Sequence, residues 1–183
     1  MIKINQLIKQ AEALEKEMQK MEYNGSAGGK LVNVILDGEV KLKSIIIDSS
    51  LTKDKEKLEK LVVIAAQNAK KQLEVEVSKV MSQSLDIISN INNKFQFMKQ
   101  ADAIQKKTLE KDYHGSSEDG LVSIVLDGHS NPRSITIDSS LTKDKEMLED
   151  LIIAAFYNAK DKIDIENPKL TSKTLINLGK FKF

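Results

Sequence analysis

Apolar residues near the start of the chain recur at steps of three and four. This spacing places them on one face of a helix, and lysines and glutamates fill most of the remaining positions. The same spacing returns near the middle of the chain. The apolar positions are Leu7, Ile8, Ala11, Leu14, Met18 and Met21 in the first stretch and Phe97, Met98, Ala101, Ile104 and Leu109 in the second. Each stretch therefore predicts an amphipathic helix.

A glycine-rich stretch and a predicted strand follow the first helix. The segment from Tyr23 to Gly29 is predicted to be a turn. Residues 31–38 place Val32, Val34 and Leu36 on one side and end in Asp-Gly, a pattern typical of a strand that closes in a hairpin. The sequence therefore predicts the first strand of a small antiparallel sheet.

A second strand is predicted over 45–48, with a counterpart over 135–138. Ile46 in the first of these is replaced by Thr136 in the second, so this position is expected to face outward. Pro132 precedes the counterpart strand, and proline cannot donate a hydrogen bond to a neighbouring strand. This strand is therefore expected at a sheet edge.

A longer helix is predicted after each pair of strands. The Ser-Ser-Leu-Thr segments that precede it supply candidate N-cap residues. The helical stripe consists of Leu58, Leu61, Val62, Ala65, Ala69 and Leu73 in the first case and of Leu148, Leu151, Ile152, Ala155, Ala159 and Ile163 in the second. Each part is then an α+β unit of helix, β-meander and helix, too thin to bury both helix faces alone.

The two parts are copies of one another. Residues 23–70 recur without a gap as residues 113–160, and about 27 of the 48 aligned positions are identical. A period of 90 residues is longer than the units of solenoids, which span roughly 20–50 residues. Because most soluble oligomers are two-fold symmetric, the pair is expected to pack as a pseudo-two-fold intramolecular dimer. The predicted segments are a first unit at 1–80, a linker at 81–94 that could extend the flanking helices, a second unit at 95–169, and a tail at 170–183 that is expected to be disordered.

Composition and charge narrow the functional classes. Hydrophobic residues make up 40% and charged residues 30% of the chain, and no apolar run approaches the roughly 20 residues of a membrane span. The N-terminus lacks the pattern of a secretory signal, so a cytoplasmic protein is expected. Cysteine is absent, which excludes disulfides and thiolate catalysis. The net charge of +1 means that any phosphate-binding surface must come from charge placement rather than charge excess.

The residue types that catalyse reactions do not form a repeated constellation. His114 and His129 align with Asn24 and Glu39 in the other copy, and both are expected in exposed turns. The aspartates that do repeat are explained by turn and helix-start positions; they are Asp37 with Asp127 and Asp48 with Asp138. Paired carboxylates could bind a cation, but no EF-hand-like spacing accompanies these aspartates. The sequence therefore predicts a protein that is not an enzyme and holds no metal or cofactor.

The glycine-rich stretch superficially suggests a phosphate cradle. It lacks the Lys-Ser or Lys-Thr ending of a P-loop, and its counterpart carries Glu118 and Asp119, which would repel phosphate. It is interpreted as a hairpin loop.

Three motifs carry a resemblance to a known family. They are Gly-Leu-Val-x-Ile-x-Leu-Asp-Gly at 120–128, Ile-Asp-Ser-Ser-Leu at 137–141, and Glu-x-Leu-Glu-Asp-Leu-Ile-x-Ala-Ala-Phe-x-Asn-Ala at 146–159. This order is similar to that of the YbaB/EbfC family of bacterial nucleoid-associated proteins. The first copy matches less closely, because Lys60, Ala66 and Gln67 depart from the motif. The resemblance covers nearly all of each copy.

The resemblance implies a fold and a partner. Family members are single units that dimerise through their sheets, and their helices project like tweezers that grip duplex DNA. This chain resembles such a dimer fused into one polypeptide, with projecting helical arms and a nucleoid location. Whether the fused pair assembles further stays open.

The resemblance also implies that helix lysines contact DNA. The candidates are Lys9, Lys16, Lys20, Lys70, Lys71, Lys99, Lys106, Lys107, Lys160 and Lys162. They would neutralise phosphates and fix position without reading bases. From composition alone, they would only solvate helix faces, paired with acids such as Glu12, Glu17 and Glu74. The later helix of the second copy carries more acids, namely Glu149, Asp150, Asp161 and Asp164, so the two arms are expected to bind unequally.

A non-enzymatic interaction scaffold is the alternative function. In that case Met18, Met21, Met98, Phe181 and Phe183 would supply adaptable contacts to another protein. The methionines are also explained by packing against the other copy. Salt dependence separates the two functions, because DNA contacts release counterions and an apolar groove does not.

Overall fold

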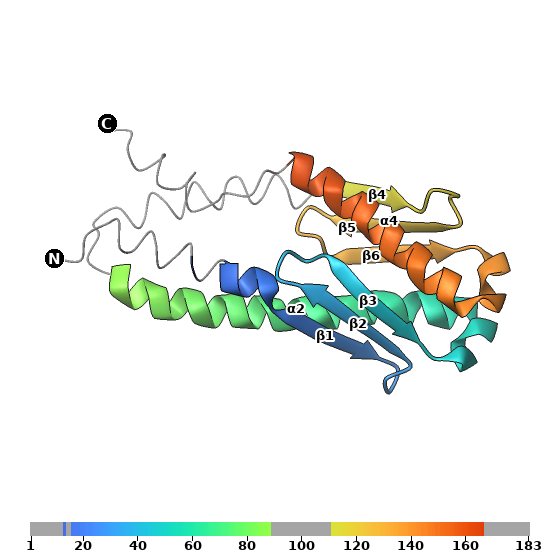
Figure 1. Ribbon diagram of the computed structural model, residues 1–183, viewed down its shortest axis with the longest axis horizontal. Coiled ribbons are helices and arrows are strands. Elements are labelled where there is room, and N and C mark those ends of the chain that lie inside the picture. The colour runs from blue at the N-terminus through green and yellow to red at the C-terminus, as the bar shows by residue number, and fades with distance from the viewer. Residues whose placement is uncertain (1–12, 14–15, 89–110, 167–183) are drawn as a thin grey trace.

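The computed structural model describes residues 13, 16–88 and 111–166 of the 183-residue chain. Within these ranges each copy has three strands, a short 3-10 helix and a long α-helix (Figure 1). The first copy contains β1 (Glu22–Ala27), β2 (Val32–Asp37), β3 (Leu42–Ile47), η1 (Ser49–Lys53) and α2 (Lys55–Ile88). The second contains β4 (Asp112–Ser116), β5 (Val122–Asp127), β6 (Pro132–Ile137), η2 (Ser139–Lys143) and α4 (Lys145–Glu166).

The strands form two separate antiparallel sheets. Their orders are β1-β2-β3 and β4-β5-β6, so each is a meander, and the predicted α+β class is confirmed. Val32, Val34 and Leu36 are all buried on one face, as the alternation predicted. Ile46 is 54% exposed and Thr136 is exposed too, which confirms the outward position. Pro132 begins β6, an edge strand of its sheet.

The glycine-rich stretch is mainly a strand, and the predicted turn over residues 23–29 is wrong for most of its length. β1 alternates exposed and buried residues, and its buried positions are Tyr23, Gly25 and Ala27. Gly25 is needed for close packing, because a Cβ atom there would lie 2.1 Å from the Ala65 carbonyl oxygen of α2. His114 likewise lies on β4 and not in a turn.

The repeated aspartates occupy the turn and helix-start positions that the sequence predicted. Asp37 accepts hydrogen bonds from the amides of Glu39 and Lys41 in the β2–β3 turn. Asp48 caps η1 by accepting from the Ser50 amide at 2.9 Å. This hydrogen bond, with that of the Ser50 hydroxyl, lowers the pKa of Asp48. The Ser and Thr residues predicted as N-caps of the long helix instead form the 3-10 turn itself, and Asp54 caps α2 by accepting from the Lys57 amide.

Asp127 makes the equivalent turn contacts in the second copy. Its carboxylate accepts from the amides of His129 and Asn131, both at 2.9 Å, and from the Asn131 side chain. Burial opposes ionisation, but these hydrogen bonds outweigh it and lower the pKa of Asp127.

We expect Asp127→Ala to lower the free energy of unfolding at pH 7 by about 2 kcal/mol, because it leaves these donors unpaired. A lowered pKa in the folded state means that the carboxylate stabilises fully above about pH 4 and less as pH falls through that pKa. Urea denaturation at pH 7 and pH 3 should therefore show the variant approaching the unaltered protein in acid. A difference that stays constant with pH would contradict this role.

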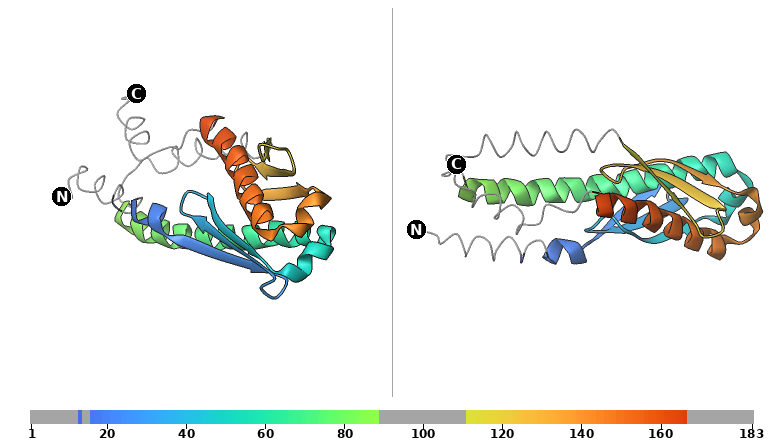
Figure 2. Two further views of the ribbon diagram at one scale, coloured as in Figure 1. Left: turned by 45° about the vertical axis from the view of Figure 1, so that its right-hand side comes forward. Right: turned by 90° about the horizontal axis from the view of Figure 1, so that it is seen from above.

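Each long helix covers its own sheet and reaches the other. α2 packs on β1 and β2 and also contacts β6, while α4 packs on β4 and β5 and also contacts β3. Figure 1 shows α4 crossing in front of the strands and α2 running behind them, and Figure 2 shows the same arrangement from two further sides. The buried side chains of both copies form one hydrophobic cluster that includes Leu36, Phe156 and Ile152. The two halves therefore share a core.

Two matching hydrogen bonds join the halves. Glu149 of α4 accepts from the Ile47 amide of β3 at 2.7 Å, and Glu59 of α2 accepts from the Ile137 amide of β6 at 2.8 Å. In each sheet, a carboxylate from the other copy thus binds the backbone of the last strand.

Several predicted segments lie partly or wholly outside the described residues. α2 continues to Ile88, so it enters the predicted linker at 81–94. The predicted helix around Phe97 to Leu109 and the tail at 170–183 are outside the described ranges. In the part of the chain that the structure describes, the helices are all too short or too polar to span a membrane.

Candidate nucleic-acid interface

The ten lysines predicted from the sequence fall into different environments. Lys16 and Lys20 are exposed on a helical segment that ends just before β1, and Lys71 is exposed on α2. Lys162 of α4 is also exposed, but its Nζ atom donates to the His114 carbonyl at 2.6 Å. Four further candidates lie outside the described residues; they are Lys9, Lys99, Lys106 and Lys107.

Lys70 and Lys160 are buried, with side chains only 6% and 4% exposed. The Lys70 ammonium binds Asn131 of the other copy and lies 3.2 Å from Glu74. The Lys160 ammonium binds Asp164 on the same helix. Both cations are held by protein oxygens inside the packed protein, so they stabilise the packed helices.

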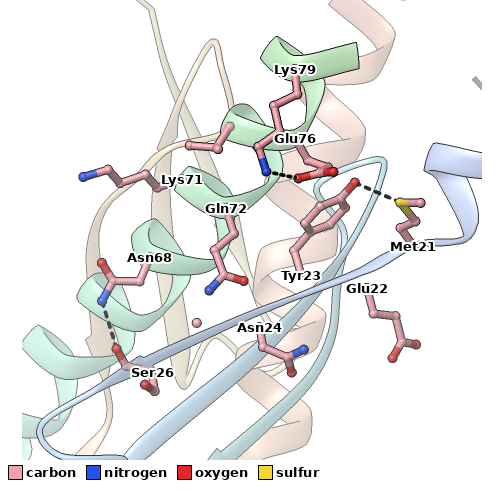
Figure 3. Close-up of a pocket in the computed structure, with 12 residues that line it drawn as sticks. Met21, Glu22, Tyr23, Asn24, Ser26, Asn68, Lys71, Gln72, Glu76 and Lys79 are labelled. Atoms are coloured by element: carbon pink, nitrogen blue, oxygen red, sulfur yellow. Dashed lines mark hydrogen bonds and ion pairs between the residues drawn. The ribbon is translucent and has the colours of Figure 1, made fainter.

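A groove lies between β1 and the middle of α2, with a volume of about 840 Å³. Figure 3 shows Gln72 pointing from α2 toward β1 and Tyr23 pointing from β1 toward α2, while Lys71 points away. Asn68 closes one end by donating to the Ser26 carbonyl at 2.9 Å. Burial, together with the nearby Glu76 carboxylate, raises the pKa of Tyr23. Tyr23 is thus a neutral side chain on the β1 side of a groove whose α2 side also carries Glu76 and Lys79.

Polar contacts bridge the corresponding place in the second copy. Lys162 reaches across to the His114 carbonyl of β4, as noted above. Glu166 binds the Lys111 ammonium and accepts from the Tyr113 hydroxyl at 3.1 Å. The ammonium of Lys111 lowers the pKa of Glu166, so the pair stays ionised. The two copies thus have the same backbone fold, but the surface between β1 and α2 differs from the surface between β4 and α4.

Three exposed lysines of α2 were not among the predicted residues. Lys57, Lys60 and Lys79 are exposed on α2, the same helix that carries Lys71. Their regular spacing along one predicted helix was the feature of the sequence that could have indicated them. Among the described residues, no group of three or more histidines and acids is placed to hold a metal ion.

The model of the YbaB/EbfC DNA-binding family matches this sequence twice, over residues 1–88 and 86–176. The chain belongs to the YbaB/EbfC DNA-binding family. Because the two matches cover nearly the whole sequence, it carries two YbaB/EbfC units in tandem, as the repeat predicted. This is a DNA-binding family and not an enzyme family.

Bacterial relatives match over about one unit of this YbaB/EbfC protein. A nucleoid-associated protein of Rickettsia prowazekii (strain Madrid E) is 36% identical over 98 residues, which cover 49% of this chain and 92% of the relative. A nucleoid-associated protein of Rickettsia felis is 43% identical over 89 residues, which cover 44% of this chain and 83% of the relative. An uncharacterized protein of Helicobacter pylori of known structure is 22% identical, with a TM-score of 0.38, over 43% of this chain and 84% of that one.

Proposed function

We propose that this YbaB/EbfC protein binds duplex DNA in the bacterial nucleoid, mainly through phosphate contacts from exposed helix lysines. The family match is the observation that carries the proposal, and relatives named nucleoid-associated proteins support the location. The exposed lysines supply the chemistry, because ammonium groups that neutralise phosphates release counterions and so favour binding. Lys16, Lys20 and Lys71 are such lysines among the described residues.

The two units act as a pseudo-two-fold intramolecular dimer in this proposal. The matching contacts of Glu59 and Glu149 support it, since each joins one copy to the last strand of the other. The length of α2 supports projecting arms. Its 34 residues correspond to about 51 Å at 1.5 Å per residue, and a six-residue strand spans only about 20 Å.

Little base readout is expected, because the chain has a single copy of the side chain that most often reads bases. Arg133 is the only arginine among the 28 basic residues. Arginine makes the commonest specific base contact, a paired hydrogen bond to guanine. Arg133 instead lies 3.2 Å from Asp112 and 3.8 Å from Asp127. Lysines act as point charges on phosphates and carry little sequence information.

We expect two labelled duplexes of about 30 base pairs with unrelated sequences to bind with affinities within about threefold of each other. If four phosphates are neutralised, affinity should fall about 10²-fold between 50 and 200 mM salt. Fluorescence anisotropy titrations at four salt concentrations would measure both. Absence of binding at 50 mM salt would overturn the proposal, and salt-independent binding would favour contacts of another kind.

A further inference from the structure

The solvent-exposed side of α2, which we call its outer face, carries a stripe of exposed residues, and part of this stripe borders the groove beside β1. They recur at steps of three and four, so they share one side of the helix. The stripe consists of Lys57, Lys60, Ile64, Asn68, Lys71, Val75 and Lys79. From Lys57 to Lys79 it extends about 33 Å at 1.5 Å per residue. This length is close to one turn of duplex DNA, about 34–36 Å.

The cations of this stripe are available to a ligand. In the ranges that the structure describes, no carboxylate pairs with the ammonium groups of Lys57, Lys60 and Lys71. Lys79 lies 3.1 Å from Glu76, but both side chains are well exposed, so this pair contributes little. A polyanion on this face would therefore displace few existing interactions.

The matching face of α4 has the opposite charge. At the positions of Lys57, Lys60 and Lys71, the second copy has Met147, Asp150 and Asp161. Three positions that carry +3 on α2 thus carry −2 on α4. All three α4 residues are exposed, so the acids face solvent as the lysines do.

The surroundings of the two helices also differ. The α2 stripe borders the open groove through Asn68, Lys71 and Lys79. In the second copy, the ammonium group of Lys162 on α4 donates a hydrogen bond to the His114 carbonyl of β4. This exposed ammonium of α4 is thus already hydrogen-bonded to the protein, unlike those of Lys57, Lys60 and Lys71 within the described part of the chain.

We infer that duplex DNA lies along the outer face of α2 and not along α4, so that the tandem protein binds DNA asymmetrically. This inference rests on the proposed DNA binding and adds its location. The first copy supplies the phosphate contacts of this face through Lys57, Lys60, Lys71 and Lys79. The second copy supplies the other half of the shared core and an acidic face that repels phosphates. A homodimer of identical units could not separate these two roles.

The inference is tested by moving charge between equivalent positions. The triple variant K57Q/K60Q/K71Q removes three phosphate contacts. We expect its affinity at 50 mM salt to fall at least about 10²-fold and its salt slope to decrease by about 2.7. The matched control K43Q/K111Q/K143Q removes the same charge from exposed positions outside α2, and its affinity should stay within about fivefold. Circular dichroism melts would establish that both variants are folded.

The reciprocal variant M147K/D150K/D161K gives α4 the charges of α2. We expect it to bind a 30-base-pair duplex more tightly and with a steeper salt slope. If the unaltered chain binds DNA but the α2 variant loses no more affinity than the control, the location on α2 is wrong while DNA binding stands. If the unaltered chain does not bind, the proposed function itself is overturned.

Discussion

Gly25→Ala should destabilise the protein by about 3 kcal/mol, although it adds a single methyl group. A Cβ atom at this position of β1 would lie 2.1 Å from the Ala65 carbonyl oxygen and 2.2 Å from the Ala69 amide nitrogen. Both are backbone atoms of α2, so no side chain can rotate to make room. Either the strand or the helix must move, and the shared core would lose contacts. Urea denaturation would measure the loss.

The repeat supplies an internal check on this prediction. Gly115 of β4 has the same relation to α4, where a Cβ atom would lie 2.3 Å from the Ala155 carbonyl oxygen, so Gly115→Ala should cost a similar amount. Ser26→Ala on the exposed side of β1 is the control and should change the free energy of unfolding by less than about 0.5 kcal/mol. A Gly25→Ala variant as stable as this control would show that strand and helix do not pack so closely.

The same glycine explains what the sequence could and could not predict about the fold. The second and third strands and the apolar stripes of α2 and α4 follow from periodicity, because large residues such as Val32 and Leu58 mark the buried positions. The buried positions of β1 are Tyr23, Gly25 and Ala27, and only the first of these is a large residue, so the strand gives almost no periodic signal. In a sequence, a glycine that permits close packing cannot be told apart from a glycine that permits a turn. Only the helix lying against it distinguishes the two.

The candidate site was predictable to a similar degree. Solvent exposure of Lys71 follows from its place beside the apolar stripe of α2. Lys70 and Lys160 were also predicted to contact DNA, but both are buried. The ammonium of Lys70 binds Asn131 of the other copy, a partner that helical periodicity cannot indicate, whereas Lys160 binds Asp164 on its own helix. Lys57 and Lys60 become distinctive only when α2 is compared with α4 position by position, where Met147 and Asp150 take their places. A single helix considered alone shows only an ordinary charged face.

Replacing both Glu59 and Glu149 by alanine should cost about 4 kcal/mol, roughly 2 kcal/mol for each. Each carboxylate accepts from the amide of a fully buried isoleucine on the last strand of the opposite sheet, Ile137 or Ile47. Removing the carboxylate leaves a buried donor unpaired at the junction of the two copies. The two sites use separate partners, so the losses should be nearly additive. Thermal and urea denaturation of the single and double variants would measure them.

Glu56→Ala and Glu146→Ala are matched controls, since these exposed glutamates begin the same two helices. Their double variant should cost less than about 1 kcal/mol. Glutamine at 59 and 149 retains a carbonyl acceptor and should recover part of the loss. If the alanine double variant is no less stable than its control, the carboxylates do not hold the strand edges. Equal losses from Glu59→Ala and Glu149→Ala, in contrast, would mean that each half stabilises the other by the same contact, which is the relation expected of a dimer joined into one chain.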